Sequence, residues 1–395
     1  MSWTVPLTDV VVTEDDIAAV LACYEAGWLT MGPRTVAFEA ALARFCGTRH
    51  AVAVSSGTAA LHLACRAAGI GPGDEVIVPS LTFLATAHAP RYCGAHTVLC
   101  DSTSPTDMNL SVADVEARIT PRTAAVIAVH FCGYAADVAA LRELCDDRGL
   151  VLIEDMAQAI GARYADGGIC GSAGELACLS FFSKKQLSVG EGGAVVTGSD
   201  ASAAAVASLR SHAMTSGTWD RHRGHEESYD VVDLGYNFRI DEPRAALGLA
   251  RIGRLAAEIE ARRTAVGWYR ERLADLERVA LLWDDEAVGR SSHFAFPIRT
   301  DSHELRVALR AGLAQRGIQT TRYPALHVLG EYAGHAAGGG LDVAETLADR
   351  HVCLPLWAQI DEPTVERVCD AVRQVVASGP LPGTPTGPKA EADTC

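Results

Sequence analysis

Short apolar segments alternate with amphipathic helical patterns from about residue 50 to residue 200, and this rhythm constrains the fold more than any other feature of the chain. The apolar segments are AVAV (51–54), EVIVP (75–79), HTVLCD (96–101), AAVIAVH (124–130) and VLIED (151–155). Between them lie segments such as TAALHLACRAAG and VAALRELCDDRG, with apolar residues at helical spacing and a glycine at the end. Apolar strands that alternate with helices are typical of a parallel sheet covered on both faces. The sequence therefore predicts an α/β fold with its ligands at the carboxyl ends of the strands.

A long charged helical pattern over residues 242–277 separates this region from a C-terminal part. That part contains HFAFPIRT, HELRVALRAGLAQRG and IQTTRYP and then two further helical patterns, which predict a strand, a helix, a strand and helices. We therefore expect a large α/β domain over residues 1–250, and a linking helix with a small α+β domain over residues 251–378. Residues 379–395 are rich in Pro, Gly and polar residues and are predicted to be disordered.

Composition excludes several classes of function. The net charge of −15 leaves no basic surplus to neutralise a nucleic acid or an anionic membrane. No basic segment followed by an apolar run opens the chain, and no stretch of about 18 apolar residues occurs, so we expect a cytoplasmic protein. The 12 cysteines are scattered without a CxxC pair. They are predicted to be free buried thiols, and no metal site is expected.

Candidate binding residues follow the first two strands. Ser55, Ser56, Gly57 and Thr58 stand between a strand and a helix, where free amide groups and the helix dipole favour an anion such as a phosphate. Ordinary helix capping by Ser56 or Thr58 explains the same residues. After the next strand, Phe83 offers a face for stacking on a flat ring, or it is a core residue. Neither feature alone decides between its two interpretations.

The segment VLIEDMAQAIGA places two acids, Glu154 and Asp155, in an otherwise apolar strand. A buried carboxylate needs a partner, because an unpaired desolvated charge is costly. A protonated pyridine nitrogen would be such a partner for Asp155, and Gln158 would reach the phenolic oxygen of the same ring. The alternative is that Asp155 caps a following helix.

Two lysines, Lys184 and Lys185, follow an apolar strand and precede a Gly-rich turn in LSFFSKKQLSVGEGGAVVT. A lysine near apolar walls and other cations loses its proton more easily, as a Schiff-base nucleophile requires. A solvated lysine pair in a loop is the alternative. A phosphate site, an aromatic residue, an acid at a strand end and a lysine about 30 residues later together match one cofactor, pyridoxal phosphate.

The same segments resemble one protein family, the DegT/DnrJ/EryC1/StrS group of sugar aminotransferases, which act in antibiotic and cell-surface polysaccharide biosynthesis. The similarity covers most of the chain, through GWLTMGP, SSGTAALHLA, EDMAQAIGA, SFFSKKQLSVGEGG, GYNFRIDEPRAALG and RYPALH. It implies fold type I of the pyridoxal-phosphate enzymes. In that fold a large domain has a central, mostly parallel seven-stranded sheet flanked by helices, and a small α+β domain follows.

The resemblance also implies roles for individual residues. The Schiff-base lysine falls on Lys185, whereas position 184 usually carries a small or polar residue. The further cofactor contacts are then the phosphate ligands Gly57, Thr58 and Ser180, the ring contacts Phe83, Asp155 and Gln158, and Asn237, which reaches the phosphate from the neighbouring subunit. The resemblance therefore implies a homodimer with shared active sites.

The expected reaction follows from these roles. An amino group passes from glutamate or glutamine to the cofactor, which becomes pyridoxamine phosphate, and then to a keto-sugar, with Lys185 moving protons. Some family members carry histidine at the lysine position and dehydrate their substrate, and Lys185 argues against that branch. The nucleotide-linked keto-deoxysugars are the main substrate class expected. A free keto-cyclitol with glutamine as donor, and a non-catalytic sensor of the cofactor or a sugar, are the alternatives.

Substrate contacts are less defined by the sequence. The family's substrate cleft corresponds to Thr30, Met31, Arg239, Tyr323 and His327, although a proline-rich turn with a capping histidine also explains RYPALH. The polar stretch 211–233, which contains His212, His222, Arg223 and His225, fits either a lid near the substrate and the neighbouring subunit or a solvated loop.

Overall fold

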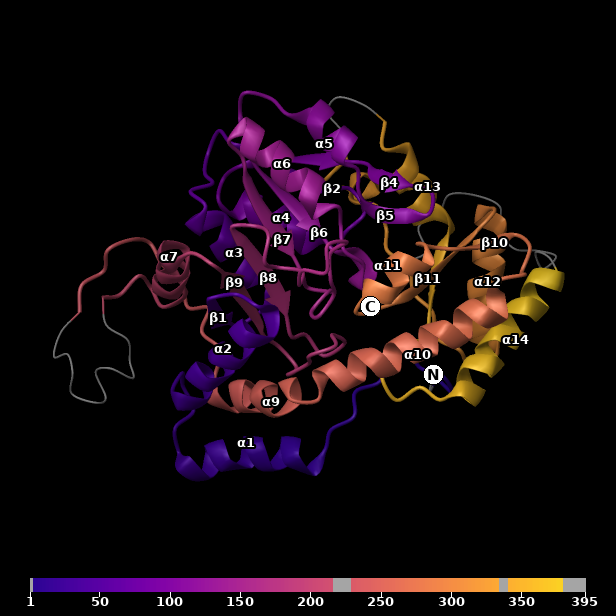
Figure 1. Ribbon diagram of the computed structural model, residues 1–395, viewed down its shortest axis with the longest axis horizontal. Helices are drawn as coiled ribbons and strands as arrows, with labels where there is room; N and C mark the ends of the chain where they lie inside the picture. Colours follow the sequence, from indigo (N-terminus) through magenta and orange to yellow (C-terminus); the bar gives the residue numbers. More distant parts are fainter. Residues whose placement is uncertain (1–2, 216–228, 334–339, 379–395) are drawn as a thin grey trace.

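The computed structural model describes residues 3–215, 229–333 and 340–378. Figure 1 shows a larger α/β part, built from the first two thirds of the chain, and a smaller part that packs beside it. The chain passes from one part to the other through α9 (Glu242–Ile252) and α10 (Leu255–Leu273). The predicted tail, 379–395, lies outside the described residues. A domain boundary at residue 250 stays a prediction.

The larger part is built on a seven-stranded sheet in the order β1-β9-β8-β7-β6-β2-β3. Four of its neighbouring strand pairs are parallel, and β9 runs antiparallel to both of its neighbours. The expected α/β fold with a mostly parallel sheet is therefore confirmed. The strands are β1 (His50–Val54), β2 (Glu75–Pro79), β3 (His96–Cys100), β6 (Thr123–Val129), β7 (Val151–Asp155), β8 (Leu176–Ser180) and β9 (Gly193–Thr197).

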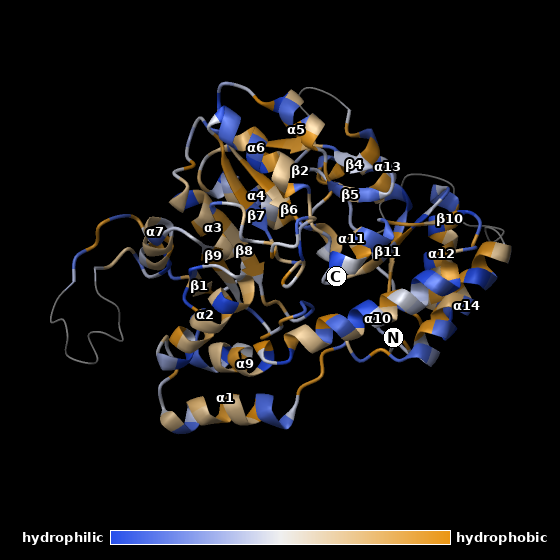
Figure 2. Cartoon of the chain, in the orientation of Figure 1, coloured by the Kyte–Doolittle hydropathy of each residue, from blue (hydrophilic) through white to orange (hydrophobic). Residues whose placement is uncertain are grey.

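Helices cover both faces of this sheet, because alternate strand residues point to opposite faces. On β2, Ile77 joins an apolar cluster with α2 (Pro33–Cys46), α6 (Val138–Arg148) and α9. Its neighbours Val76 and Val78 join a second cluster with α3 (Gly57–Ala67), α4 (Leu84–Tyr92) and α7 (Asp200–Arg210). In Figure 2 much of the central sheet is coloured toward the hydrophobic end of the scale. Two buried faces explain why these strands are almost continuously apolar.

The smaller part has a three-stranded antiparallel sheet in the order β10-β11-β12. Its strands are β10 (Val279–Leu281), β11 (Phe296–Thr300) and β12 (His351–Leu354), and its main helices are α10, α12 (His303–Gln315) and α14 (Glu362–Ser378). Val5, near the N-terminus, packs into the same apolar core. The remaining elements are α1 (Glu14–Ala26), β4 (Ser102–Ser104), β5 (Asp107–Leu110), α5 (Val112–Arg118), η1 (Phe131–Gly133), α11 (Asp285–Arg290), η2 (Leu326–Val328) and α13 (Asp342–Arg350).

Two expected elements differ from the structure. The helical pattern over 242–277 forms two helices rather than one, with the break at Gly253 and Arg254, where glycine has a low helix propensity. At this break Arg254 donates to both carboxylate oxygens of the buried Asp16, which anchors the break to α1. The expected strand IQTTRYP forms only isolated bridges, from Ile318 to Val5 and from Thr321 to Cys353.

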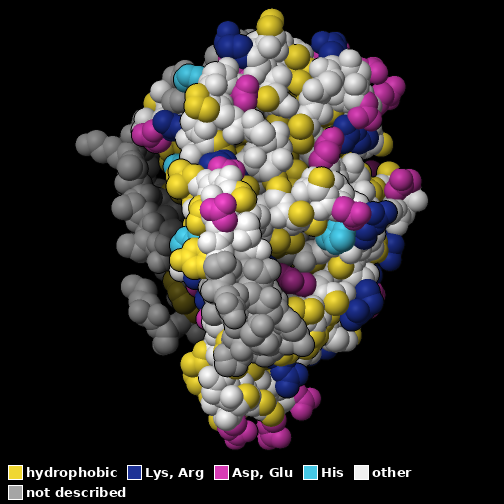
Figure 3. Space-filling view, turned by 90° about the vertical axis from the view of Figure 1, so that its left-hand side faces the viewer, with side chains coloured by type: hydrophobic (Ala, Val, Ile, Leu, Met, Phe, Trp, Pro, Cys, Tyr) yellow, Lys and Arg dark blue, Asp and Glu magenta, His cyan; other side chains and the backbone are white. Residues whose placement is uncertain are grey.

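The surface carries charges of both signs. Acidic and basic side chains are interspersed with apolar ones on the face shown in Figure 3. In the part of the chain that the structure describes, no helix is long and apolar enough to cross a membrane.

Candidate active site

One cavity of about 430 Å³ opens where the carboxyl ends of β6, β7 and β8 meet the smaller part. Most of the residues predicted from strand ends line this cavity, as the topology of a parallel sheet requires. They are Ser56, Gly57, Thr58, Phe83, Asp155, Gln158, Ser180, Lys184 and Lys185.

Lys185 is half-buried in this cavity, and its Nζ lies 4.5 Å from the centroid of the Phe294 ring. Its backbone N–H donates to the carbonyl oxygen of Phe182 at 2.8 Å, which fixes the loop that follows β8. Burial lowers the pKa of Lys185 to about 8, although the negative charge of Asp155 acts in the opposite direction. A substantial fraction of Lys185 is therefore neutral near pH 8 and able to act as a nucleophile.

Lys184 is exposed and lines the same cavity. The next residue, Gln186, is buried, and its Nε2 donates to the carbonyl oxygen of Gln158 at 2.8 Å and to Ser292 Oγ at 3.0 Å. These bonds fix the loop on its C-terminal side. The structure thus separates the two lysines, with Lys185 inside the cavity and Lys184 toward solvent.

Asp155 is buried at the end of β7 with its carboxylate at the cavity. One carboxylate oxygen accepts a hydrogen bond from Thr86 Oγ1 at 2.8 Å, and the other accepts one from the N–H of Ala157 at 3.0 Å. Turns, rather than an α-helix, follow β7, so helix capping does not explain this residue. Gln158 also lines the cavity, and its Oε1 accepts from the N–H of Cys132 at 2.7 Å.

Glu154, the other acid of β7, is fully buried and serves a different purpose. Its carboxylate accepts hydrogen bonds from His130 Nε2 at 2.8 Å and the Tyr164 hydroxyl at 2.5 Å, and from the backbone N–H groups of Gly171, Ala173 and Gly174. Burial by itself raises the pKa of Glu154, and the hydrogen bonds outweigh this effect and hold the pKa below its usual value. Glu154 therefore fixes the loop that follows β7.

The start of α3 combines a helix cap with free donors. Ser56 is the N-cap, and its Oγ accepts from the N–H of Ala59 at 3.1 Å. The N–H groups of Gly57 and Thr58 have no acceptor among the described residues, and both residues line the cavity. A Cβ added to Gly57 would lie 2.8 Å from Ser180 Cβ. The glycine therefore allows a close approach of helix and strand beside the two free donors.

Phe83 precedes α4, lines the cavity and is 56% exposed. This exposure excludes a role as a core residue. The aromatic face is available to a ligand in the cavity.

Of the predicted substrate contacts, only Tyr323 lines this cavity. Its ring packs edge-on against Phe131 at 5.1 Å, and its N–H donates to His351 Nε2 at 2.9 Å. Four other predicted substrate contacts do not line the cavity of the described chain. The residue expected to reach the phosphate from the neighbouring subunit does not line it either. These residues are Thr30, Met31, Asn237, Arg239 and His327. Their roles stay predictions.

The positions of these residues are nevertheless well defined. Thr30 and Met31 precede α2, in a turn held by Glu242, whose carboxylate accepts from the N–H of Gly32 at 2.8 Å. Asn237 pairs with Ser211 across the base of the 211–233 stretch. The middle of that stretch, 216–228, including His222, Arg223 and His225, lies outside the described residues.

His327 and Arg239 are also placed by local contacts. The Nδ1 atom of His327 is 2.7 Å from Ser80 Oγ. Burial lowers the pKa of Arg239, and the charge of Arg210 acts in the same direction. No group of three or more His, Cys, Asp or Glu side chains among the described residues is placed to hold a metal ion.

Sequence reasoning missed the opposite wall of the cavity. That wall comes from the N-terminal segment and the smaller part, and consists of Leu7, Thr8, Phe294, Ala295, Thr321, Cys353, Leu354 and Leu356. Leu7 is held there by backbone hydrogen bonding, because its carbonyl oxygen accepts from the N–H of Leu356 at 2.9 Å. No motif marked these residues.

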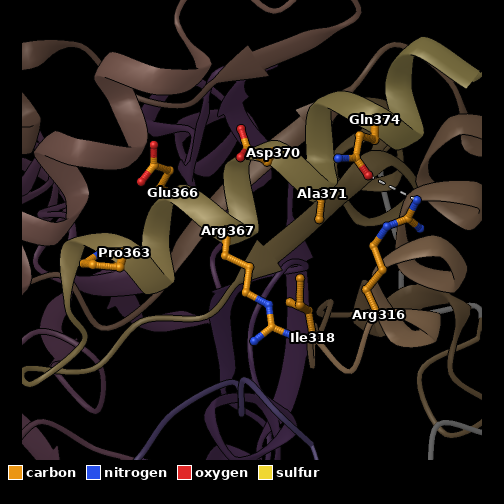
Figure 4. Close-up of a pocket in the computed structure, with 8 residues that line it drawn as sticks. All are labelled: Arg316, Ile318, Pro363, Glu366, Arg367, Asp370, Ala371 and Gln374. Carbon is orange, nitrogen blue, oxygen red and sulfur yellow. Dashed lines mark hydrogen bonds between the residues drawn. The ribbon is translucent and has the colours of Figure 1, made fainter.

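A second hollow lies on the outside of the smaller part, between the end of α12 and α14 (Figure 4). Its volume is about 560 Å³, and its lining includes Arg316, Glu366, Arg367 and Asp370. Arg316 Nη2 donates to Gln374 Oε1 at 3.5 Å. No residue of the central sheet lines this hollow, whereas the predicted strand-end residues line the cavity around Lys185, which is therefore the candidate active site.

The chain is similar to known proteins over most of its length. The chain is 38% identical to GDP-perosamine synthase from Caulobacter vibrioides over 361 residues, which cover 90% of this chain and 94% of that protein. It is 39% identical to dTDP-3-amino-3,4,6-trideoxy-alpha-D-glucose transaminase from Streptomyces venezuelae over 363 residues, which cover 90% and 91%.

A solved structure of Spr1654 from Streptococcus pneumoniae, in its PLP-form, superimposes with a TM-score of 0.85 at 25% identity. The match covers 96% of this chain and 99% of Spr1654. Residues 11–373 match the model of the DegT/DnrJ/EryC1/StrS aminotransferase family. With a family match over nearly its whole length and two curated relatives at this level of identity, the chain belongs to the DegT/DnrJ/EryC1/StrS aminotransferase family.

Proposed function

We propose that this aminotransferase uses pyridoxal phosphate to transfer an amino group from glutamate or glutamine to a keto-sugar, with a nucleotide-linked keto-deoxysugar as the substrate class. One observation carries the proposal. A lysine with a lowered pKa, a buried carboxylate and two free backbone donors at a helix start all line one cavity, with Phe83 beside them. The two curated relatives are named for GDP-linked and dTDP-linked amino sugars, which supports the substrate class.

The residues of the cavity fit this cofactor. The free N–H groups of Gly57 and Thr58 at the positive end of α3 would hold the phosphate, together with the Ser180 hydroxyl. Phe83 would stack on the ring. When bound, the cofactor supplies an electron sink that stabilises negative charge on the substrate carbon.

Two residues of β7 and its following turn would orient the ring and set its charge. Asp155 would hold the proton on the pyridine nitrogen, and the bonds from Thr86 and Ala157 keep its carboxylate in place. Gln158 would contact the phenolic oxygen.

Lys185 would have two tasks in the reaction. Its neutral amine would hold the cofactor covalently, and a pKa of about 8 lets the amine exist in that form near neutral pH. As a free amine, the same group would carry a proton to and from the reacting carbon. The Phe294 ring forms part of the cavity wall beside this amine.

Covalent trapping tests this proposal. The chain contains three lysines, Lys184, Lys185 and Lys389, so borohydride reduction of the cofactor-loaded protein followed by peptide mass spectrometry gives an unambiguous site. We expect the cofactor on Lys185. The variants Lys185→Arg and Lys184→Arg form a matched pair, since each removes one primary amine and keeps its charge. Only the Lys185 variants, including Lys185→Ala, should lose the label.

The second arm of the experiment uses the amino donors. Addition of glutamate or glutamine to the loaded wild-type protein should release the cofactor from Lys185 and so abolish trapping. A protein that binds the cofactor but loses no label with any amino acid would contradict the aminotransferase proposal. Such a result would favour the non-catalytic sensor.

We also propose that the active enzyme is a homodimer in which Asn237 completes the phosphate site of the partner. Its support is the family resemblance, together with the position of Asn237 outside the cavity of its own chain. Mixing inactive Lys185→Ala and inactive Asn237→Ala protomers should then restore activity, because a mixed dimer contains one intact site. Absence of restoration in mixed dimers, isolated with two different tags, would contradict a shared site.

The substrate class is tested separately. A nucleotide-linked keto-sugar and a free keto-cyclitol are offered to the enzyme after loading with its amino donor. Faster consumption of the free keto-cyclitol would replace the nucleotide-linked class by the aminoglycoside-type alternative.

A further inference from the structure

Lys184 and Lys185 occupy different depths of one cavity. Both line it, but Lys185 is half-buried beside an aromatic ring, whereas Lys184 is exposed. The loop that carries them is fixed on both sides by the hydrogen bond from the Lys185 N–H to Phe182 and by the bonds of Gln186. The two ammonium groups therefore mark an inner and an outer position on the path of a ligand.

Lys184 is the cation that an anion meets at this outer position. The charged residues that line the cavity in the described chain are Asp155, Lys184, Lys185 and Glu191, and no described arginine or histidine lines it. Asp155 is occupied by its own hydrogen bonds, and Lys185 is reserved for the covalent chemistry. Lys184 forms no ion pair with any residue that the structure describes. Its charge is therefore available to a ligand.

The composition of the chain makes a lysine at this position unusual. Of the 34 Lys and Arg residues only three are lysines, and two of these three are Lys184 and Lys185. The chain thus has arginine at almost all of its basic positions, and Lys184 departs from this preference. A lysine ammonium is a compact point charge, and it binds phosphate without the fixed fork geometry of arginine.

We propose that Lys184 is a specificity-determining residue that binds the diphosphate of a nucleotide-linked keto-sugar. This proposal rests on the proposed function and names the group that the outer cation recognises. The reacting carbonyl carbon must reach Lys185 at the inner position. The sugar ring separates this carbon from the diphosphate, so the diphosphate lies toward the mouth of the cavity. The α-carboxylate of an amino donor is bonded directly to the reacting carbon and belongs at the inner position instead. In a chain with a net charge of −15, a local cation is needed to hold such an anion.

The experiment measures binding and kinetics of the cofactor-loaded protein with Lys184→Ala and Lys184→Arg. GDP and dTDP serve as binding probes in calorimetry, and a nucleotide-linked keto-sugar serves as substrate. Lys184→Ala should weaken nucleoside diphosphate binding and raise KM by about tenfold, which corresponds to ~1.4 kcal/mol, with little change in kcat. Lys184→Arg keeps the charge and should retain most of the binding. Added salt should weaken binding to the wild type more than to Lys184→Ala, because salt screens an exposed charge pair.

Each other outcome overturns the proposal. Equal binding of GDP and dTDP by the wild type and Lys184→Ala, or no binding by the wild type, removes the diphosphate contact. A lower kcat with unchanged KM assigns Lys184 to the chemical step. A slower reaction with the amino donor, with nucleotide binding intact, assigns it to the donor carboxylate. Failure of the proposed function is recognised separately, as absence of any reaction with an amino donor in the wild type.

Discussion

Replacement of Gly57 by alanine is the most direct test of the phosphate site. The new Cβ would lie 2.8 Å from Ser180 Cβ and 3.1 Å from Ser180 Oγ. Carbon atoms pack best at about 3.5–4.0 Å, so α3 and β8 must move apart by roughly 0.7 Å or more. Overpacking of this kind costs about 1–3 kcal/mol. The displacement falls on the two donors and the hydroxyl proposed to hold the phosphate, and weakening of these hydrogen bonds by about 1–3 kcal/mol should lower cofactor affinity by roughly 5- to 150-fold.

The assay is a titration of the cofactor-free protein with pyridoxal phosphate, together with a thermal melt. Gly198→Ala is the matched control, because nothing lies within 4 Å of its added Cβ and its backbone lies outside the left-handed region. Alanine is a better helix former than glycine by up to about 1 kcal/mol, which offsets part of the strain on folding. Gly57→Ala should therefore lose cofactor affinity with a modest change in melting temperature. An affinity equal to that of Gly198→Ala would refute the site.

Three further predictions follow from individual side chains. Because burial lowers the pKa of Lys185 to about 8, the rate of covalent cofactor attachment to the cofactor-free protein should rise with pH and reach half its plateau near pH 8. The rate is measured by rapid-mixing absorbance, and a midpoint near pH 10.5 would contradict the lowered pKa. In Glu154→Gln a carboxamide NH2 group replaces one carboxylate oxygen and faces buried hydrogen-bond donors, which then lack an acceptor. Urea denaturation should therefore show a loss of about 1–3 kcal/mol in unfolding free energy. Asp155→Asn keeps the size of the side chain but removes its charge, and should slow the reaction with the amino donor by about 10²-fold at full cofactor occupancy; an unchanged rate would remove Asp155 from the chemistry.

The sequence predicts the larger part of the fold well, because its signals are local. Residues 76–79 and 151–153 are apolar because both faces of those strands are buried, and they lie in β2 and β7. Most candidate cofactor residues of this part also lie at or just after the end of a strand: β1 for Gly57 and Thr58, β2 for Phe83, β7 for Asp155 and Gln158, and β8 for Ser180 and Lys185. Parallel strands bring such ends to one edge, so their convergence follows from topology alone.

The rest of the fold depends on contacts that no short segment contains. Residues 318–324 look like a strand by composition, but they find only single bridging partners, Val5 and Cys353. The short strand β10 lies in the apolar run 279–283, but it has only three residues and pairs only with β11. The wall of the cavity that includes Phe294 and Leu356 likewise forms only when the smaller part packs against the sheet. This wall has no local motif, so sequence reasoning could not have found it without the tertiary structure.

The start of α3 shows why the competing interpretations of one motif need not exclude each other. Helix capping and anion binding were alternatives for Ser56, Gly57 and Thr58, yet the structure contains the cap and keeps the donors. The Ser56 hydroxyl oxygen accepts a hydrogen bond from the N–H of Ala59. The N–H groups of Gly57 and Thr58 are left without an acceptor in the described chain. By fixing the first turn, the cap holds these two donors at the cavity wall before any ligand arrives, which lowers the entropy cost of binding. At a strand-helix junction of a parallel sheet, a capping serine followed by glycine therefore supports an anion site rather than competing with it.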